Sequence, residues 1–234
     1  MRRNLLYHVY PKSGNGIWQW NVAQLRRRMA QFDGRRVIAI MTAADADPPA
    51  AVQEEFGNDG GITWLILPNN PGLREVASFL PLFSRVAEPD DSITFYSHAK
   101  GVTHPGNEAV RIWTEVLYSV CLDDPAVISD SLSRSVMVGA MRKTERFLSS
   151  SWHFHGSFFW FRNDYVFSSD WMRIDSNSHG IESWPGSITP KECSTCLLLD
   201  DAGSAYDLNY CRSTVVPQLR LWQLSRGLSP SPIS

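Results

Sequence analysis

The chain has 234 residues, a length that suits one well-buried α/β domain and is short for two. Its formal net charge of -2 excludes a general attraction to nucleic acid or anionic membrane, and its apolar fraction of 43% is ordinary for a soluble globular protein. The sequence holds no apolar run near the roughly 18 residues of a membrane span. Four cysteines and an N-terminus that resembles a first strand more than a signal peptide favour a reduced, cytoplasmic setting.

Strands and helices are predicted to alternate along the chain. Apolar or β-branched runs predict strands, and apolar residues at three- and four-residue steps predict helices. The predicted strands are 5–10, 37–41, 63–67, 93–96, 136–141 and 157–161, and the predicted helices lie near 18–32, 73–86, 107–120, 124 onward, 163–171 and 215–224. Pro81 is expected to kink or split the second helix, and 175–190 reads as a polar, turn-rich loop. The alternation is typical of a Rossmann-like, mainly parallel sheet flanked by helices, here as one domain over 1–228, followed by a disordered tail at 229–234.

The stretch 91–104 carries the clearest candidate site. Its strand ends in a polar cluster that contains His98, Lys100 and Gly101. Ligands of open α/β sheets bind at the carboxyl ends of the strands, so a basic cluster there predicts an anion site, and we interpret it as a diphosphate site. No Asp-x-Asp follows the strand, which favours neutralisation by side-chain cations over a bound metal. The alternative is a solvated lysine beside a structural histidine.

Residues near the first two strands are candidates for binding a nucleotide. The loop 13–16, which includes Gly14, precedes a helix whose free N–H groups could face a phosphate, although it could equally be a plain turn. The dinucleotide fingerprint is excluded because its third glycine is replaced by Gln19, and no P-loop ending is present. Tyr10 ends the first strand, and Asp45 follows the second, where it could accept a ribose hydroxyl or serve a turn.

The second half of the chain offers three weaker constellations. His153 and His155 would share a face if extended, where they could bind a sugar, a phosphate or zinc, or be a buried structural pair; no third zinc ligand stands at a telling spacing. Glu182 could be a general base for an acceptor hydroxyl, or a surface carboxylate. Cys193 and Cys196 form half of a zinc or redox motif, and free thiols are the expected state.

Three blocks of sequence together resemble a known family. The strand ending "SHAKG", the run "HFHGSFFWFRNDY" and the later "GIESWPG" are similar to blocks of bacterial glycosyltransferase-like proteins of polysaccharide synthesis, which have a GT-A-type nucleotide-sugar-binding fold. The matching positions are His98, Lys100, Gly101, Gly156, Phe158, Trp160, Arg162, Tyr165, Glu182 and Trp184. Ser157 stands where the family usually has Asn, and Asp45-Ala-Asp47 has the letters of the metal motif but follows the wrong strand. The resemblance therefore implies either metal-independent catalysis or a binding relative without turnover.

Residues and resemblance together predict a glycosyltransferase that moves a sugar from a nucleotide-sugar donor to a glycan or other hydroxyl acceptor, without a divalent metal cofactor. The expected nucleotide contacts are Tyr10, Gly14 and Asp45; the diphosphate contacts are His98, Lys100 and Gly101; the sugar or acceptor contacts are His155, Gly156 and Trp184; and the base is Glu182. One alternative is a non-catalytic nucleotide-sugar or glycan-binding module. Another is a metal hydrolase that uses His98, His104, His153 and His155.

Overall fold

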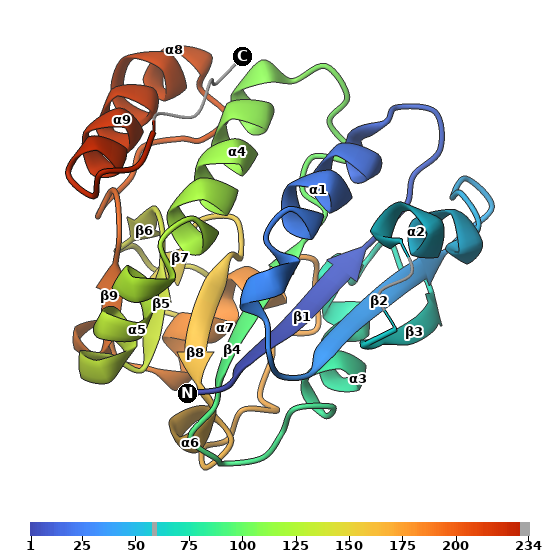
Figure 1. Cartoon of the computed structure of the whole chain (residues 1–234), viewed down its shortest axis with the longest axis horizontal. Coiled ribbons are helices and arrows are strands. Elements are labelled where there is room, and N and C mark those ends of the chain that lie inside the picture. Colours follow the sequence, from blue (N-terminus) through green and yellow to red (C-terminus); the bar gives the residue numbers. More distant parts are fainter. Residues whose placement is uncertain (58–59, 230–234) are drawn as a thin grey trace.

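The structure, a computed structural model, describes residues 1–57 and 60–229, and its centre is a seven-stranded sheet in the order β3-β2-β1-β4-β8-β5-β9 (Figure 1). The strands of this sheet are β1 (Arg3–Val9), β2 (Arg36–Thr42), β3 (Ile62–Pro68), β4 (Ile93–His98), β5 (Met137–Gly139), β8 (Phe159–Arg162) and β9 (Ser194–Cys196). The short strands β6 (Arg142–Lys143) and β7 (His153–Phe154) form a separate antiparallel pair.

Helices cover both faces of the sheet. They are α1 (Ile17–Arg26), η1 (Met29–Gln31), α2 (Pro49–Phe56), η2 (Arg74–Ser78), α3 (Phe79–Phe83), α4 (Glu108–Leu122), α5 (Pro125–Arg134), α6 (Asn163–Val166), α7 (Gly180–Ile188), η3 (Lys191–Cys193), α8 (Leu208–Tyr210), η4 (Cys211–Val215) and α9 (Val216–Leu224). Alternate residues of each central strand face opposite sides, as the period of two requires. On β1, Leu5 and Tyr7 therefore pack into a core with α1, α2, α4, α5 and α9, whereas Leu6 packs into a second core with α3, α6 and α7.

The strand directions confirm the predicted mixed, mainly parallel sheet. β1 pairs in parallel with β2 and β4, β2 pairs in parallel with β3, and only β8 runs antiparallel to its neighbours β4 and β5. Because the chain leaves β1 towards β2 and β3 and then returns to β4 on the other side of β1, the strand order reverses between β1 and β4. In open α/β sheets this reversal point is where ligands bind.

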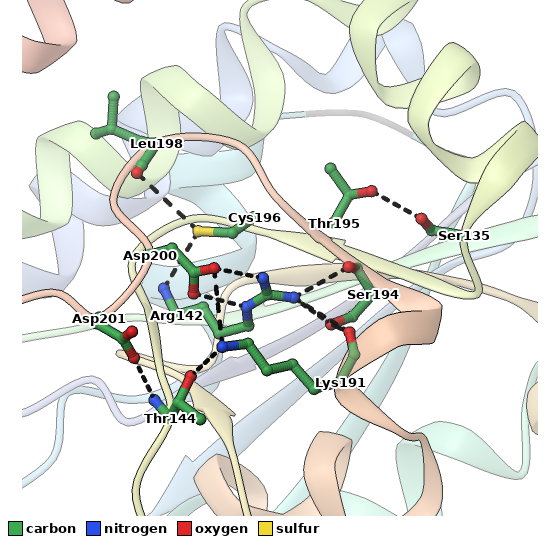
Figure 2. Close-up of polar contacts among 10 residues, drawn as sticks. All are labelled: Ser135, Arg142, Thr144, Lys191, Ser194, Thr195, Cys196, Leu198, Asp200 and Asp201. Atoms are coloured by element: carbon green, nitrogen blue, oxygen red, sulfur yellow. Dashed lines mark hydrogen bonds and ion pairs between the residues drawn. The ribbon is translucent and has the colours of Figure 1, made fainter.

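Arg142 fastens the C-terminal segment to the second half of the sheet (Figure 2). Its side chain is 8% exposed and forms a two-point contact with Asp200, with nitrogen–oxygen distances of 2.9 Å and 2.6 Å. A third nitrogen donates to the backbone oxygen of Ser194 at 3.0 Å and to its hydroxyl at 2.7 Å. Cys196 accepts the Arg142 backbone N–H at 3.4 Å, so that thiol takes part in the anchor. All four cysteines are free thiols, as expected.

Two element predictions are wrong, and a third is confirmed in part. The region 175–190 contains the helix α7, whose Ile181 and Trp184 are buried and which carries Pro185 within it. The helix expected at 73–86 is split, as predicted, into the 3₁₀ segment η2 and the short helix α3, but it ends earlier than expected. The helix expected to reach residue 171 ends as α6 at Val166. The tail prediction concerns residues that, beyond 229, lie outside the described part of the chain.

Over residues 1–57 and 60–229, no helix combines the length and the apolar character that crossing a bilayer requires.

Candidate functional site

A cavity of about 340 Å³ opens at the carboxyl ends of β1 and β4, at the reversal point of the sheet. We call it the cationic cavity because three long cations and three imidazoles line it, against two carboxylates. Its charged and histidine lining residues are His8, Lys12, Asp45, Arg74, Glu75, His98, Lys100 and His104; Tyr10, Gly101 and Tyr206 are among the others. Five of the predicted site residues are therefore brought together: Tyr10, Asp45, His98, Lys100 and Gly101.

His98, the last residue of β4, is held from both sides. It is 7% exposed; its Nε2 lies 3.1 Å from the backbone oxygen of Gly156, and its Nδ1 lies 2.9 Å from Glu75 Oε1 as an ion pair without good hydrogen-bond alignment. Burial, the largest single influence, acts to raise the pKa of Glu75, but the interactions with His98 and His8 and a backbone hydrogen bond together outweigh it and hold that pKa well below its usual range. Glu75 is therefore ionised, and its charge is matched inside the protein.

His8 lies beside His98, because β1 and β4 pair these two residues in register. Its Nδ1 is 2.7 Å from the Ser78 hydroxyl, and the side chain is 4% exposed. Burial lowers the pKa of His8 to about 4, and the neighbouring His98 acts in the same direction while Glu75 opposes both. His8 is therefore a neutral imidazole near neutral pH, in contrast to the cations that share the cavity.

Lys100 follows β4 and has its ammonium 3.7 Å from the centre of the Trp113 ring, a cation–π contact. Burial lowers the pKa of Lys100, and the charges of Glu182 and Glu75 oppose that shift. Among the residues that the structure describes, no carboxylate forms an ion pair with this ammonium. The positive charge of Lys100 therefore stays available to an anionic ligand in the cavity.

A buried polar network fixes the backbone of Lys100. Asn21 of α1 is fully buried and brackets Lys100: its amide nitrogen donates to the Lys100 backbone oxygen at 2.9 Å, and its amide oxygen accepts the Lys100 N–H at 3.2 Å. The Tyr118 hydroxyl also donates to Asn21, at 3.2 Å, and lies 3.1 Å from the Tyr7 hydroxyl. Helix α1, helix α4 and strand β1 thus position this lysine together.

Tyr10 and Asp45 form a polar pair at the rim of the cavity. The Tyr10 hydroxyl donates to Asp45 Oδ1 at 2.5 Å, and Lys12 lies 4.0 Å from the other oxygen. The hydrogen bond from Tyr10 lowers the pKa of Asp45, and burial together with this bond raises the pKa of Tyr10 to about 12. The Asp45 side chain is 61% exposed, so it can still accept a hydrogen bond from a ligand.

Gly156 links the cavity to Glu182 through its backbone. Its N–H donates to Glu182 Oε1 at 3.0 Å, while its carbonyl faces His98. With φ at +93°, and with Leu117 and Trp113 atoms 2.8 Å from where a Cβ would stand, this position admits only glycine. Gly156 therefore acts through its backbone and not as a wall of the cavity.

Other predicted residues lie outside the cationic cavity. Gly14 is exposed in its loop and lines neither this cavity nor the second one described next. Trp184 is fully buried in the core beneath α7, packed against Phe79 and Phe83, with its N–H bound to the Trp171 backbone oxygen at 2.8 Å. The placement of Trp184 in a sugar pocket is therefore corrected: no face of its ring is open to a ligand.

A second cavity of about 430 Å³ adjoins the first and shares Lys100, Gly101, His104 and Val110 with it. Trp20 lines this cavity, with the Arg111 guanidinium 5.4 Å from the centre of its ring. Lys100 thus stands between two spaces, one rich in cations and one with an aromatic wall.

Sequence reasoning missed several residues of the cationic cavity. Arg74 and Glu75 were not identified because they lie in a segment predicted only as a helix, and Tyr206 lies in a segment for which no element was predicted; all three reach the cavity through the tertiary fold. His8 had a usable signal, since a histidine near the end of one predicted parallel strand can meet a histidine at the end of the next.

The four-histidine hydrolase site is not formed as expected. Within the described residues, His153 and His155 instead group with Glu182, and the ligand atoms of the three lie within 4.8 Å of one another. His98 and His104 line the cationic cavity and do not belong to that group.

Comparison with known proteins gives only distant matches. No family model and no curated protein matches the chain. Among solved structures, a mannosyltransferase from Pyrobaculum calidifontis in complex with GDP-Man and Mn²⁺ is 11% identical with a TM-score of 0.41, covering 100% of this chain and 67% of its own. A candidate nucleotide-diphospho-sugar transferase from Desulfovibrio desulfuricans G20 is 11% identical with a TM-score of 0.41 and covers 95% and 99%. A 4-diphosphocytidyl-2C-methyl-D-erythritol synthase is 12% identical with a TM-score of 0.39 and covers 94% and 99%. At these scores the similarity carries no argument, and function has to be argued from the site.

Proposed function

We propose that the chain is a glycosyltransferase that binds a nucleotide-diphospho-sugar in the cationic cavity and passes the sugar to a hydroxyl acceptor. The observation that carries this proposal is the concentration of Lys12, Arg74 and Lys100 around one cavity at the reversal point of the sheet. A diphosphate leaving group gains negative charge as its bond to the sugar breaks, and fixed cations stabilise that charge. The cavity volume also falls within the range of small-molecule sites, roughly 300–1,000 Å³.

The proposal assigns the diphosphate to side-chain cations without a bridging metal. Two carboxylates line the cavity, and both are engaged: Glu75 pairs with His98, and Asp45 accepts from Tyr10. A magnesium ion at a phosphate is usually held by one or two carboxylates, and here each carboxylate already has a protein partner. Lys100, with Arg74, therefore supplies the charge, and Gly101 lets the backbone approach the phosphate.

The exposed oxygen of Asp45 is proposed to accept a hydroxyl of the nucleoside, with Tyr10 holding the carboxylate in place. The acceptor is proposed to enter the second cavity, where the Trp20 ring offers the flat apolar face on which sugars stack. Glu182 lines neither cavity, so we do not propose it as the base that deprotonates the acceptor.

A thermal-shift screen against UDP-, GDP-, CMP- and dTDP-sugars, run in EDTA, tests the proposal. We expect one nucleotide class to raise the melting temperature, and Arg74→Ala to reduce that shift. Arg134→Ala is the matched control, because Arg134 pairs with Asp130 on the exposed face of α5. A flat response to all four classes would contradict the proposal. A shift without any transfer or hydrolysis of the donor would replace it with a non-catalytic nucleotide-sugar-binding module.

A further inference from the structure

Beside Trp113, whose ring also carries the Lys100 ammonium, lies a compact group of two histidines and a carboxylate that the proposed transfer reaction does not use. It consists of His153, His155 and Glu182, and we call it the three-ligand cluster. The Trp113 ring contacts both regions: the Lys100 ammonium lies 3.7 Å from the ring centre, and the centre of the His155 ring lies 4.8 Å from it. None of the three residues lines either cavity.

Two elements that are distant in sequence build the cluster. His153 lies on β7, and His155 follows two residues later, so that their rings come to 5.9 Å between centres at an angle of 79°. Glu182 comes from the first turn of α7. The helix approaches β7 so closely that a Cβ at Gly186 would stand 1.9 Å from the Trp152 backbone oxygen, and glycine there makes the approach possible.

The polar atoms of the cluster are under-satisfied. His153 is 2% exposed, and the Nδ1 atoms of His153 and His155 are both buried without a hydrogen-bond partner among the described residues. Buried polar atoms in proteins are normally paired, and leaving one unpaired costs about 1–3 kcal/mol. Each of the three side chains also places one ligand atom within 4.8 Å of the others, and together these observations indicate a partner that accepts lone pairs from all three.

The carboxylate of the cluster is already oriented by the backbone. The Gly156 N–H holds one carboxylate oxygen at 3.0 Å, as outer hydrogen bonds orient ligands in metal sites.

We propose that His153, His155 and Glu182 bind one divalent transition-metal ion of the zinc class. Two imidazoles and one carboxylate suit Zn²⁺ and its neighbours in the first transition row, whereas Ca²⁺ and Mg²⁺ prefer sites made of oxygen. Ligand atoms at bonds of roughly 2.0–2.1 Å around a tetrahedral ion lie about 3.3 Å apart, so small rotations of the side chains complete the site. Three protein ligands leave a fourth position for water or for His179, whose Nδ1 is 4.0 Å from Glu182 Oε2.

The test is direct metal binding by the full chain, stripped with a chelator and then titrated with Zn²⁺ by calorimetry and with Co²⁺ by its visible absorption. We expect one equivalent to bind per chain, with Co²⁺ giving the intense bands of a tetrahedral site. Glu182→Gln, which keeps size and hydrogen bonding, is expected to weaken Zn²⁺ at least tenfold, and the double variant His153→Ala/His155→Ala to abolish binding.

The matched control is Cys193→Ser/Cys196→Ser, since the Cys-x-x-Cys pair is the other candidate ligand set in this chain. We expect that variant to bind Zn²⁺ like the wild type. Absence of binding by the wild type, or binding that survives Glu182→Gln unchanged and disappears in the cysteine variant, would overturn the proposal. Circular dichroism of each variant, with Glu182→Gln as the least disruptive, separates loss of ligand from loss of fold. The proposal of a metal site is independent of the proposed function. This experiment measures metal binding and not donor binding, so a negative result would not contradict the proposed transferase site.

Discussion

The cationic cavity and the three-ligand cluster both contact Trp113, through Lys100 and through His155, and they have opposite electrostatic characters. In the cavity, Lys100 keeps its charge against a ring face, with no carboxylate in ion-pair contact among the described residues. In the cluster, an ionised Glu182 stands between two neutral imidazoles. The cavity carries three long cations against two carboxylates, and the cluster carries one carboxylate beside two imidazoles, so a ligand of the opposite charge would suit each region.

The backbone of Gly156 contacts both regions, through its carbonyl to His98 and its N–H to Glu182. Its substitution is expected to have the largest effect on stability. In Gly156→Ala the new methyl would stand 2.8 Å from atoms of Leu117 and Trp113 at a φ of +93°. Overpacking and backbone strain together should lower the free energy of unfolding by about 2–5 kcal/mol. Chemical denaturation measures this loss.

Gly14→Ala is the matched control for that prediction. Gly14 has a similar φ of +84°, but nothing lies within 4 Å of its Cβ position. Only the strain remains, which should cost about 1–2 kcal/mol. An equal loss of unfolding free energy in the two variants would contradict the overpacking expected at Gly156.

The buried histidines predict a loss of stability in acid. The folded pKa of His8 is about 4, below the ordinary value of 6.5, so the unfolded chain takes up the proton first. The contribution of neutral His8 is therefore complete above about pH 6.5 and is lost as the pH falls towards 4, by an amount on the order of 3 kcal/mol. His155, with a pKa of about 4, acts in the same direction from the cluster.

Denaturation curves at pH 7, 6, 5 and 4 measure this effect. His8→Asn should show a shallower decline than the wild type, because Asn does not titrate and can keep the hydrogen bond to Ser78. His179→Asn is the control, since His179 is 52% exposed. Parallel declines for His8→Asn and the wild type would show that His8 is not held neutral by burial.

The smallest effect is expected at the rim. Asp45→Asn should weaken donor affinity by roughly two- to tenfold, the usual size for one hydrogen bond at a wet site. Tyr10→Phe should have a similar effect, because it releases the same carboxylate. Competition binding with the preferred nucleotide sugar measures both variants, and an unchanged affinity in both would remove the pair from the nucleoside site.

The regular half of the fold could be predicted from sequence because its signals are local. Runs such as 37–41 are apolar throughout, as strands covered on both faces must be, and β2 forms there. Helix α7 could not be predicted in that way: Gly180, Pro185 and Gly186 are poor helix formers, and tertiary packing of Ile181 and Trp184 decides the outcome.

The candidate site likewise contains residues that local sequence signals predict and residues that only the tertiary fold brings together. His98, Lys100 and Gly101 were predictable because they directly follow one strand, and the carboxyl edge of a parallel sheet is a general ligand site. Two other contacts were not predictable: His98 pairs with Glu75, and His153 and His155 group with Glu182, which lies 27 positions beyond His155. No recognisable sequence motif marks either contact, because each depends on how η2 and α7 pack against the sheet.

Calorimetry of a nucleoside diphosphate and its monophosphate, titrated in EDTA into the wild type and into Lys100→Met, tests the central claim most directly. Methionine keeps much of the length of the side chain and its packing on Trp113 but removes the charge. The account predicts that the wild type binds the diphosphate more tightly than the monophosphate. It also predicts that Lys100→Met lowers the diphosphate affinity by about 10- to 150-fold, corresponding to the 1.5–3 kcal/mol of a hydrogen bond to a charged group. Equal diphosphate affinity in the two proteins would contradict it.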